Sequence, residues 1–269
     1  MISIRSGFDP DKIIAQDQAR QAEERKAAEA AARQKEIGER RGRKKGTPVA
    51  PATPSAPSVA PYKGIQFEPF AYRADENGER KTEKELFTYD QSLAGLQVGG
   101  FDRHPLPFEV FSLLADNLEN KLTDPGLKAV AEDMLKSHGE WLDMAMERKG
   151  DILQVYFGVS GLRWDGKKYV RDNFLADQAQ QFNIKGIPSS QYVDLVQFPD
   201  QFTQAVYGRT FAALPTDMRS GNRQAQVYLP NDGIIRPVGL GVFLGRFDAV
   251  AAFKIEASRG VRQAPQGAR

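Results

Sequence analysis

Hydrophobic and polar positions follow three different patterns in turn along this chain. In residues 11–37 the apolar positions are mostly alanine among strong helix formers, which predicts a long helix that begins after Asp9 and Pro10. Five prolines then lie among Ala, Ser, Thr and Val, which predicts a semi-extended spacer. From Tyr62 onward large apolar side chains recur, and 25 of the 26 aromatic residues lie there. We therefore expect a helical arm (1–46), a linker (47–61), a globular domain (62–258) and a flexible tail (259–269).

Two stretches of the domain have helical periodicity. In residues 108–122 four large apolar side chains share one helical face, namely Phe111, Leu114, Leu118 and Leu122. Thr123, Asp124 and Pro125 form a helix start, and apolar positions at helical spacing continue to about Met146. Because the link between the two helices is short, we expect an amphipathic pair that packs antiparallel.

The rest of the domain has extended patterns. Strands are expected in residues 64–73, 86–89, 152–159, 192–198, 224–229 and 234–255, a hairpin in 162–170 and a short helix in 173–182, whereas 202–214 fits either structure. The turn Asp165-Gly166 specifies the hairpin. Aliphatic residues alternate with Gly239 and Gly241, and such a glycine face marks a close approach by another backbone, a bulge or a bend. The expected fold class is α+β, with a mainly antiparallel sheet.

Charge is distributed unevenly between the arm and the domain. The total is +2, but residues 1–61 carry 12 Lys/Arg and 8 Asp/Glu, which leaves a domain of net charge −2. A domain that mainly grips nucleic-acid backbone would be strongly basic. The chain has no cysteine, which excludes disulfides, thiolate chemistry and cysteine-ligated metals. Neither a signal peptide nor a membrane span is evident, so a cytoplasmic or virion location is expected.

Two parts of the arm are candidate contacts. Five positive charges lie together at its end, namely Arg40, Arg41, Arg43, Lys44 and Lys45. This cluster fits a nucleic acid or an acidic partner, and alternatively a solvated helix end whose cations favour the negative pole of the helix dipole. A narrow apolar seam, made mainly by Ile13, Ile14, Ala19 and Ala22, fits a helix that is clamped by a partner, and also one that is solvated on all sides.

The hairpin supplies a third candidate. Trp164 and Tyr169 lie among Arg163, Lys167, Lys168 and Arg171, a composition that suits stacking on the bases of single-stranded nucleic acid. The alternative is a cross-strand aromatic pair with the lysines pointing outward.

Catalytic chemistry has little support in the sequence. The two histidines, His104 and His138, are too far apart in sequence for a metal motif, and His138 fits a partly buried structural role better than that of a general base. Glu132 and Asp133 fit a solvated helix face, and the glycines near Gly239 match no phosphate-binding loop. We expect neither a metal nor a cofactor.

These features lead to three functional hypotheses. The first is a non-enzymatic structural component of a large assembly, most concretely a phage or virus particle, whose arm docks on other subunits, copies of itself included. The second is an accessory protein that binds single-stranded DNA or RNA, and the third is an enzyme with a dispersed site. The first is favoured because an arm, a spacer and a nearly neutral domain suit assembly.

Overall fold

The computed structural model describes residues 59–69, 71, 86–136, 139–171, 179–241, 246–255 and 257–264. The chain divides between Pro54 and Ser55, and all of the described residues belong to the second part. The expected arm, most of the linker and His138 lie outside the described residues.

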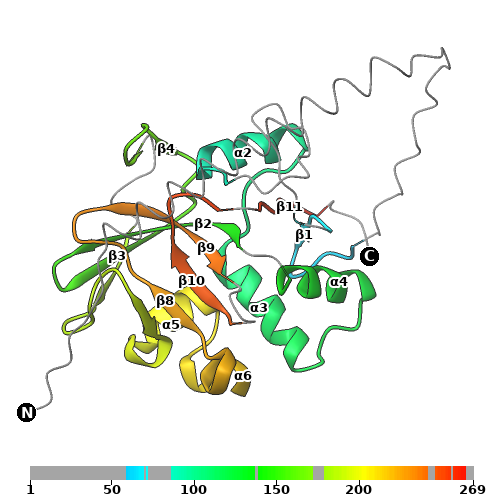
Figure 1. Cartoon of the computed structure of the whole chain (residues 1–269). Coiled ribbons are helices and arrows are strands. Elements are labelled where there is room, and N and C mark those ends of the chain that lie inside the picture. The colour runs from blue at the N-terminus through cyan, green and yellow to red at the C-terminus, as the bar shows by residue number, and fades with distance from the viewer. Residues whose placement is uncertain are drawn as a thin grey trace, which may run out of the picture. The chain divides into compact units, whose positions relative to one another are not determined.

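A seven-stranded sheet forms the centre of the domain (Figure 1). Its strands, in spatial order, are β6 (Gln180–Asn183), β3 (Ile152–Phe157), β2 (Glu140–Lys149), β9 (Ile235–Gly241), β10 (Asp248–Ala251), β8 (Gln226–Tyr228) and β7 (Tyr192–Asp194). All neighbours pair antiparallel except β10 and β8. Two small antiparallel sheets accompany it: β1 (Ile65–Phe67) with β11 (Val261–Gln263), and β4 (Leu162–Trp164) with β5 (Tyr169–Arg171). The expected α+β class with a mainly antiparallel sheet is confirmed.

The helices begin where the sequence signals them. The α-helices are α2 (Tyr89–Val98), α3 (Pro107–Leu118), α4 (Pro125–Met134), α5 (Asp200–Tyr207) and α6 (Thr216–Arg219), and short 3-10 turns cover Leu195–Gln197, Phe211–Ala213 and Gly221–Arg223. The Asp124 carboxylate accepts a hydrogen bond of 2.8 Å from the Leu127 N–H, and Pro125 is the first residue of α4. At the start of α3 the Glu109 carboxylate accepts a hydrogen bond of 2.7 Å from the Leu106 N–H. These contacts satisfy amide groups that no helical carbonyl reaches.

The two faces of β2 bury different sets of side chains. Leu142 and Met144 join the larger core cluster, which includes side chains of α3, α4 and α5, whereas Trp141 and Ala145 join a second cluster with Tyr89 of α2. Eight consecutive residues at the start of β2 are buried. The strand is therefore covered on both faces and lies within a layered core.

The expected helix through Met146 is wrong beyond Met134. Residues that were assigned to it form β2, because a strand that is buried on both faces has a continuous apolar run that does not differ in periodicity from a buried helix. Gly139, at φ +155°, separates the two elements, and a side chain there would lie 3.1 Å from Ile255. The helix expected in residues 173–182 is also wrong at its end, because β6 begins at Gln180.

Other expected elements are shorter or differently arranged than the patterns indicated. The strand expected in 192–198 gives way to a 3-10 turn at Leu195, and α2 begins at Tyr89, where a strand was expected. Residues 234–255 form the two neighbouring strands β9 and β10. Of the three causes expected for the glycine face, the structure has a close approach at Gly239, where a Cβ would overlap the Ile255 side chain and lie 3.1 Å from the Glu140 carbonyl oxygen.

Arg259 ties the two ends of the domain together. Its fully buried guanidinium donates to both carboxylate oxygens of Glu140 at 2.9 and 3.0 Å, to Asp133 at 2.5 Å and to the Glu68 carbonyl at 2.7 Å. Burial opposes a charged arginine, but the facing carboxylates outweigh that effect and raise the pKa of Arg259. Asp133 is therefore an ion-pair partner rather than the solvated acid that was expected.

The packed domain is longer than the expected 62–258. At its beginning Val59 is buried, with 4% of its surface exposed, and its carbonyl accepts from the Gln66 side chain at 3.4 Å. At its end Arg259 is buried and β11 pairs with β1. Residues 259–264 are thus part of the fold rather than of a flexible tail.

We predict that a chain lacking residues 1–58 is more stable than one lacking residues 1–61. The longer deletion removes the buried Val59 side chain, which should lower the free energy of unfolding by about 1–3 kcal/mol. Urea unfolding of the two truncated chains measures the difference, with the full-length chain as reference. Equal midpoints would place the start of the core after residue 61.

Candidate functional site

The structure places the two expected stacking residues in one cross-strand pair. Trp164 on β4 lies opposite Tyr169 on β5, with ring centroids 5.1 Å apart and ring planes inclined at 61°. Phe253 extends the cluster, because its ring centroid lies 5.6 Å from that of Trp164. The hairpin specified by Asp165-Gly166 is therefore confirmed, with the cross-strand geometry that was the alternative interpretation.

Tyr169 packs in the interior of the domain. Only 2% of its surface is exposed; its hydroxyl donates to the Phe253 carbonyl at 2.5 Å and accepts from the Tyr89 N–H at 3.1 Å. Burial raises the pKa of Tyr169. Its ring therefore offers no open face to a base, and Trp164, which is half-buried, is the only one of the two that reaches the surface.

The same surface includes two residues that the sequence analysis missed. Phe253 is 39% exposed, and the guanidinium carbon of Arg236 lies 3.5 Å from its ring centroid. Burial lowers the pKa of Arg236. Lys167 and Lys168 are exposed at the neighbouring turn. No spacing in the sequence joins Arg236, Phe253 and Trp164, because they come from three separate segments.

The fully buried acid Asp143 has a structural role. One of its oxygens accepts from the Tyr89 hydroxyl at 2.9 Å and from the Val159 N–H at 2.8 Å. Burial raises the pKa of Asp143, and it lowers that of the neighbouring buried His104 to about 3. His104 is therefore a neutral core residue whose ring centroid lies 4.8 Å from that of Tyr89, and it is not placed to exchange protons with a substrate.

Glu147 and Asp248 are two further buried acids. Glu147 lies 2.9 Å from the Tyr156 hydroxyl and 3.4 Å from the Arg171 guanidinium. The Asp248 carboxylate accepts a hydrogen bond of 3.0 Å from the Gln226 N–H and forms an ion pair of 3.4 Å with Arg246. These contacts connect neighbouring strands.

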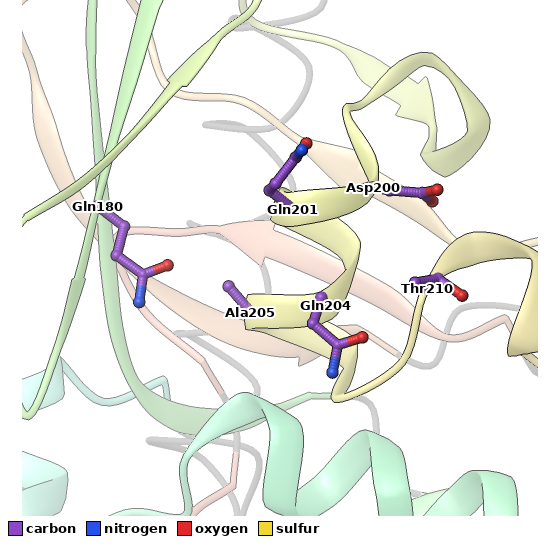
Figure 2. A pocket seen from close by; sticks show the side chains of 6 residues that line it. All are labelled: Gln180, Asp200, Gln201, Gln204, Ala205 and Thr210. Carbon is purple, nitrogen blue, oxygen red and sulfur yellow. The ribbon is translucent and has the colours of Figure 1, made fainter.

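Two hollows flank α5 and share Gln204 in their walls. The first, about 460 Å³, lies between Gln180 on β6 and the side chains of α5 (Figure 2). The second, about 350 Å³, is lined by Tyr62, Lys63 and Phe108 among other residues. Phe108 is 40% exposed, so this hollow combines an open aromatic surface with polar groups.

Ionisable side chains at these hollows are already engaged. Asp200 accepts a hydrogen bond of 3.1 Å from the Phe211 N–H, and Glu109 binds the Arg103 guanidinium through both of its oxygens at 2.7 and 2.8 Å.

Across the described ranges, no three His, Asp or Glu side chains gather in a way that would hold a metal ion. Of the helices that the structure describes, none has the length and hydrophobicity to traverse a bilayer.

We predict that Asp248 makes the stability of the domain depend on pH. Burial raises its pKa from 3.8 to about 6, so the folded state keeps this proton over a range in which the unfolded chain has lost it. Its contribution to stability should therefore fall as pH rises from about 4 to about 6, by about 2–3 kcal/mol. Asp248→Asn removes this dependence.

Urea unfolding at pH 4.5 and pH 7.5 measures the effect. Relative to the wild-type chain, Asp248→Asn should gain stability at the higher pH, whereas Asp217→Asn, at an exposed position on α6, should change little. A difference between wild type and Asp248→Asn that is the same at both pH values would contradict the assignment.

Comparison with protein-family models, characterised proteins and solved structures gives no match for this chain. Its function is therefore inferred from the geometry of the chain itself.

Proposed function

We propose that this protein is a non-enzymatic structural component of a large multi-subunit assembly, in concrete form a phage or virus particle. In this proposal the arm (1–46) is helical when it docks on a neighbouring subunit, and the domain makes the remaining contacts. The neighbouring subunits include other copies of this chain.

The observation that carries the proposal is the closure of the domain around Arg259. This buried cation is neutralised by Glu140 and Asp133, and it joins the start of the domain at Glu68 to the segment before β11. The other buried acids described above also find their partners within the domain. A domain that is complete in this way leaves the arm available for another molecule.

The composition of the arm supports docking by close backbone approach. Its seam contains Ile13, Ile14, Ala19 and Ala22, and small side chains let a partner helix or groove come near. Large side chains are too few to form a core of the arm's own, so order is gained on association. The positive cluster at residues 40–45 would then contact acidic groups of the partner.

We predict that deletion of residues 1–58 prevents incorporation without unfolding the domain. In the organism that encodes the chain, tagged full-length and truncated forms would be compared for co-sedimentation with the particle. Loss of the arm should reduce recovery about tenfold or more, because one of two linked contacts is removed.

Two controls separate the alternatives in that experiment. Circular dichroism and urea unfolding must show that the truncated domain is folded, and nuclease treatment must leave the full-length chain bound to the particle. Normal incorporation of the folded, truncated chain would rule out docking by the arm. Release of the full-length chain by nuclease would favour the second candidate.

The second candidate is binding of single-stranded nucleic acid at the hairpin. It is supported by half-buried Trp164 beside exposed Phe253, with exposed Lys167 and Lys168 at the adjoining turn. A base can stack on the exposed aromatic surface while the lysines neutralise phosphates. The roles of Arg40, Arg41, Arg43, Lys44 and Lys45 would then be additional phosphate contacts.

We predict for this candidate that oligo-dT quenches the fluorescence of Trp164. The other tryptophan, Trp141, is fully buried, so it should respond little. Lys167→Gln with Lys168→Gln should reduce the slope of log affinity against log salt by about 1.4, at ~0.7 per phosphate contact on a single strand. Lys185→Gln, at an exposed position on another segment, should leave the slope unchanged, and an absence of quenching at low salt would eliminate the candidate.

A further inference from the structure

We infer that two copies of this chain associate through an open edge of the central sheet, where β7 of one copy pairs antiparallel with β7 of the other about a two-fold axis at Val193. The contact rests on the proposed assembly role, for which it names the surface where copies of the chain meet. It requires no residue of the arm.

The backbone of β7 has one side without a neighbouring strand. It is the last strand of the described sheet, and β8 lies on its other side. Just after β7 the Leu195 N–H donates to the Ala225 carbonyl at 3.1 Å, in the same register as the β7–β8 pairs. Because residues of an antiparallel strand alternate between facing their neighbour and facing away, Tyr192 and Asp194 direct their N–H groups to the open edge.

A second copy of β7 complements this edge. When the strand is turned about Val193, Asp194 of one copy lies opposite Tyr192 of the other. The Asp194 N–H then donates to the Tyr192 carbonyl of the second copy, and the axis generates the same hydrogen bond in the opposite direction. A two-fold interface requires such self-complementarity of donor and acceptor.

Two large apolar side chains are exposed at this edge. Tyr192 is 42% exposed, and its ring centroid lies 5.1 Å from that of Tyr228 on β8. Val196, just beyond the strand, is 56% exposed. At the opposite edge of the sheet, the exposed residues of β6 are the amides Gln180, Gln181 and Asn183. Proteins usually protect an open edge with charge, a bulge or a covering segment, so the apolar surface at β7 indicates association.

Charge complementarity favours a second copy over an unrelated partner. The Asp194 carboxylate accepts a hydrogen bond of 2.8 Å from the Gln226 side chain, and no cation pairs with it in the described part of the chain. The guanidinium carbon of Arg246 lies 5.6 Å from the Tyr192 ring centroid. Since Tyr192 of the second copy lies opposite Asp194, it brings that copy's Arg246 toward this carboxylate. The axis forms the contact twice.

Sedimentation velocity of the full-length chain over a range of concentrations tests the pairing. The interface is small, so a weak dimer that dissociates on dilution is expected. Asp194→Pro should raise the dissociation constant about tenfold or more, because it removes both symmetric hydrogen bonds. Asp194 already has a φ of −61° and an outward N–H, so proline suits the folded chain at this position.

Two further variants separate charge from position. Asp194→Asn keeps the backbone N–H and should raise the dissociation constant about threefold, because two exposed ion pairs are lost. A carboxylate that served to protect the edge from pairing would give the opposite result, a tighter dimer in Asp194→Asn, and this would contradict the proposal. Gln181→Lys, at the opposite edge, should leave the dissociation constant unchanged.

Amide hydrogen exchange in the wild-type chain identifies the edge without any substitution. The Asp194 N–H should exchange rapidly in dilute solution and become protected as the concentration rises, because only the dimer gives it a partner. The Val193 N–H faces β8 and should be protected throughout.

Three results would overturn the pairing. The first is a chain that stays monomeric at every concentration. The second is a dimer that Asp194→Pro leaves unchanged while urea unfolding shows that the variant is folded, which would place the association elsewhere, for example in the arm. The third is an Asp194 N–H whose exchange does not change as the dimer forms.

The proposed function fails by a different result. A chain that dimerises through β7 but does not co-sediment with a particle supports the pairing and contradicts the assembly role. A monomeric chain that co-sediments with the particle contradicts the pairing alone.

Discussion

The fold depends on the neutralisation of one buried cation. Arg259 has no solvent exposure, and its guanidinium is bound by Glu140 at the start of β2, by Asp133 near the end of α4 and by the Glu68 carbonyl. An unpaired charge in such a place would cost several kcal/mol. The cluster therefore holds only if three segments far apart in sequence meet, and it makes the two ends of the domain interdependent.

Other buried acids are likewise bound by groups of the domain itself. Asp143 joins β2 to Tyr89 of α2, and Asp248 joins β10 to the backbone of β8. Each acid serves to fix neighbouring elements in register, at a desolvation cost that raises its pKa. Because these groups are engaged by the domain's own residues, they stabilise the fold rather than present charge at its surface.

Local signals predicted much of the fold, and long-range burial decided the rest. The start of α4 at Asp124-Pro125, the turn at Asp165-Gly166 and the close approach at Gly239 each depend on a residue type with a specific local geometry. The identity of β2 was missed because a strand covered on both faces loses the alternation that marks strands. The structural role of residues 259–264 was missed because their composition is that of a tail, while their order comes from carboxylates that precede Arg259 by more than a hundred residues.

For the candidate sites, too, local signals predicted one part and packing decided the other. Trp164 and Tyr169 were recognisable as a pair from their turn, but only the packing shows that Tyr169 faces inward and that Phe253 takes its place at the surface. The hairpin turn is visible in the sequence because its signal is local. The surface that Trp164 forms with Phe253 and Arg236 has no sequence signature, because it is a property of segments that meet only after folding.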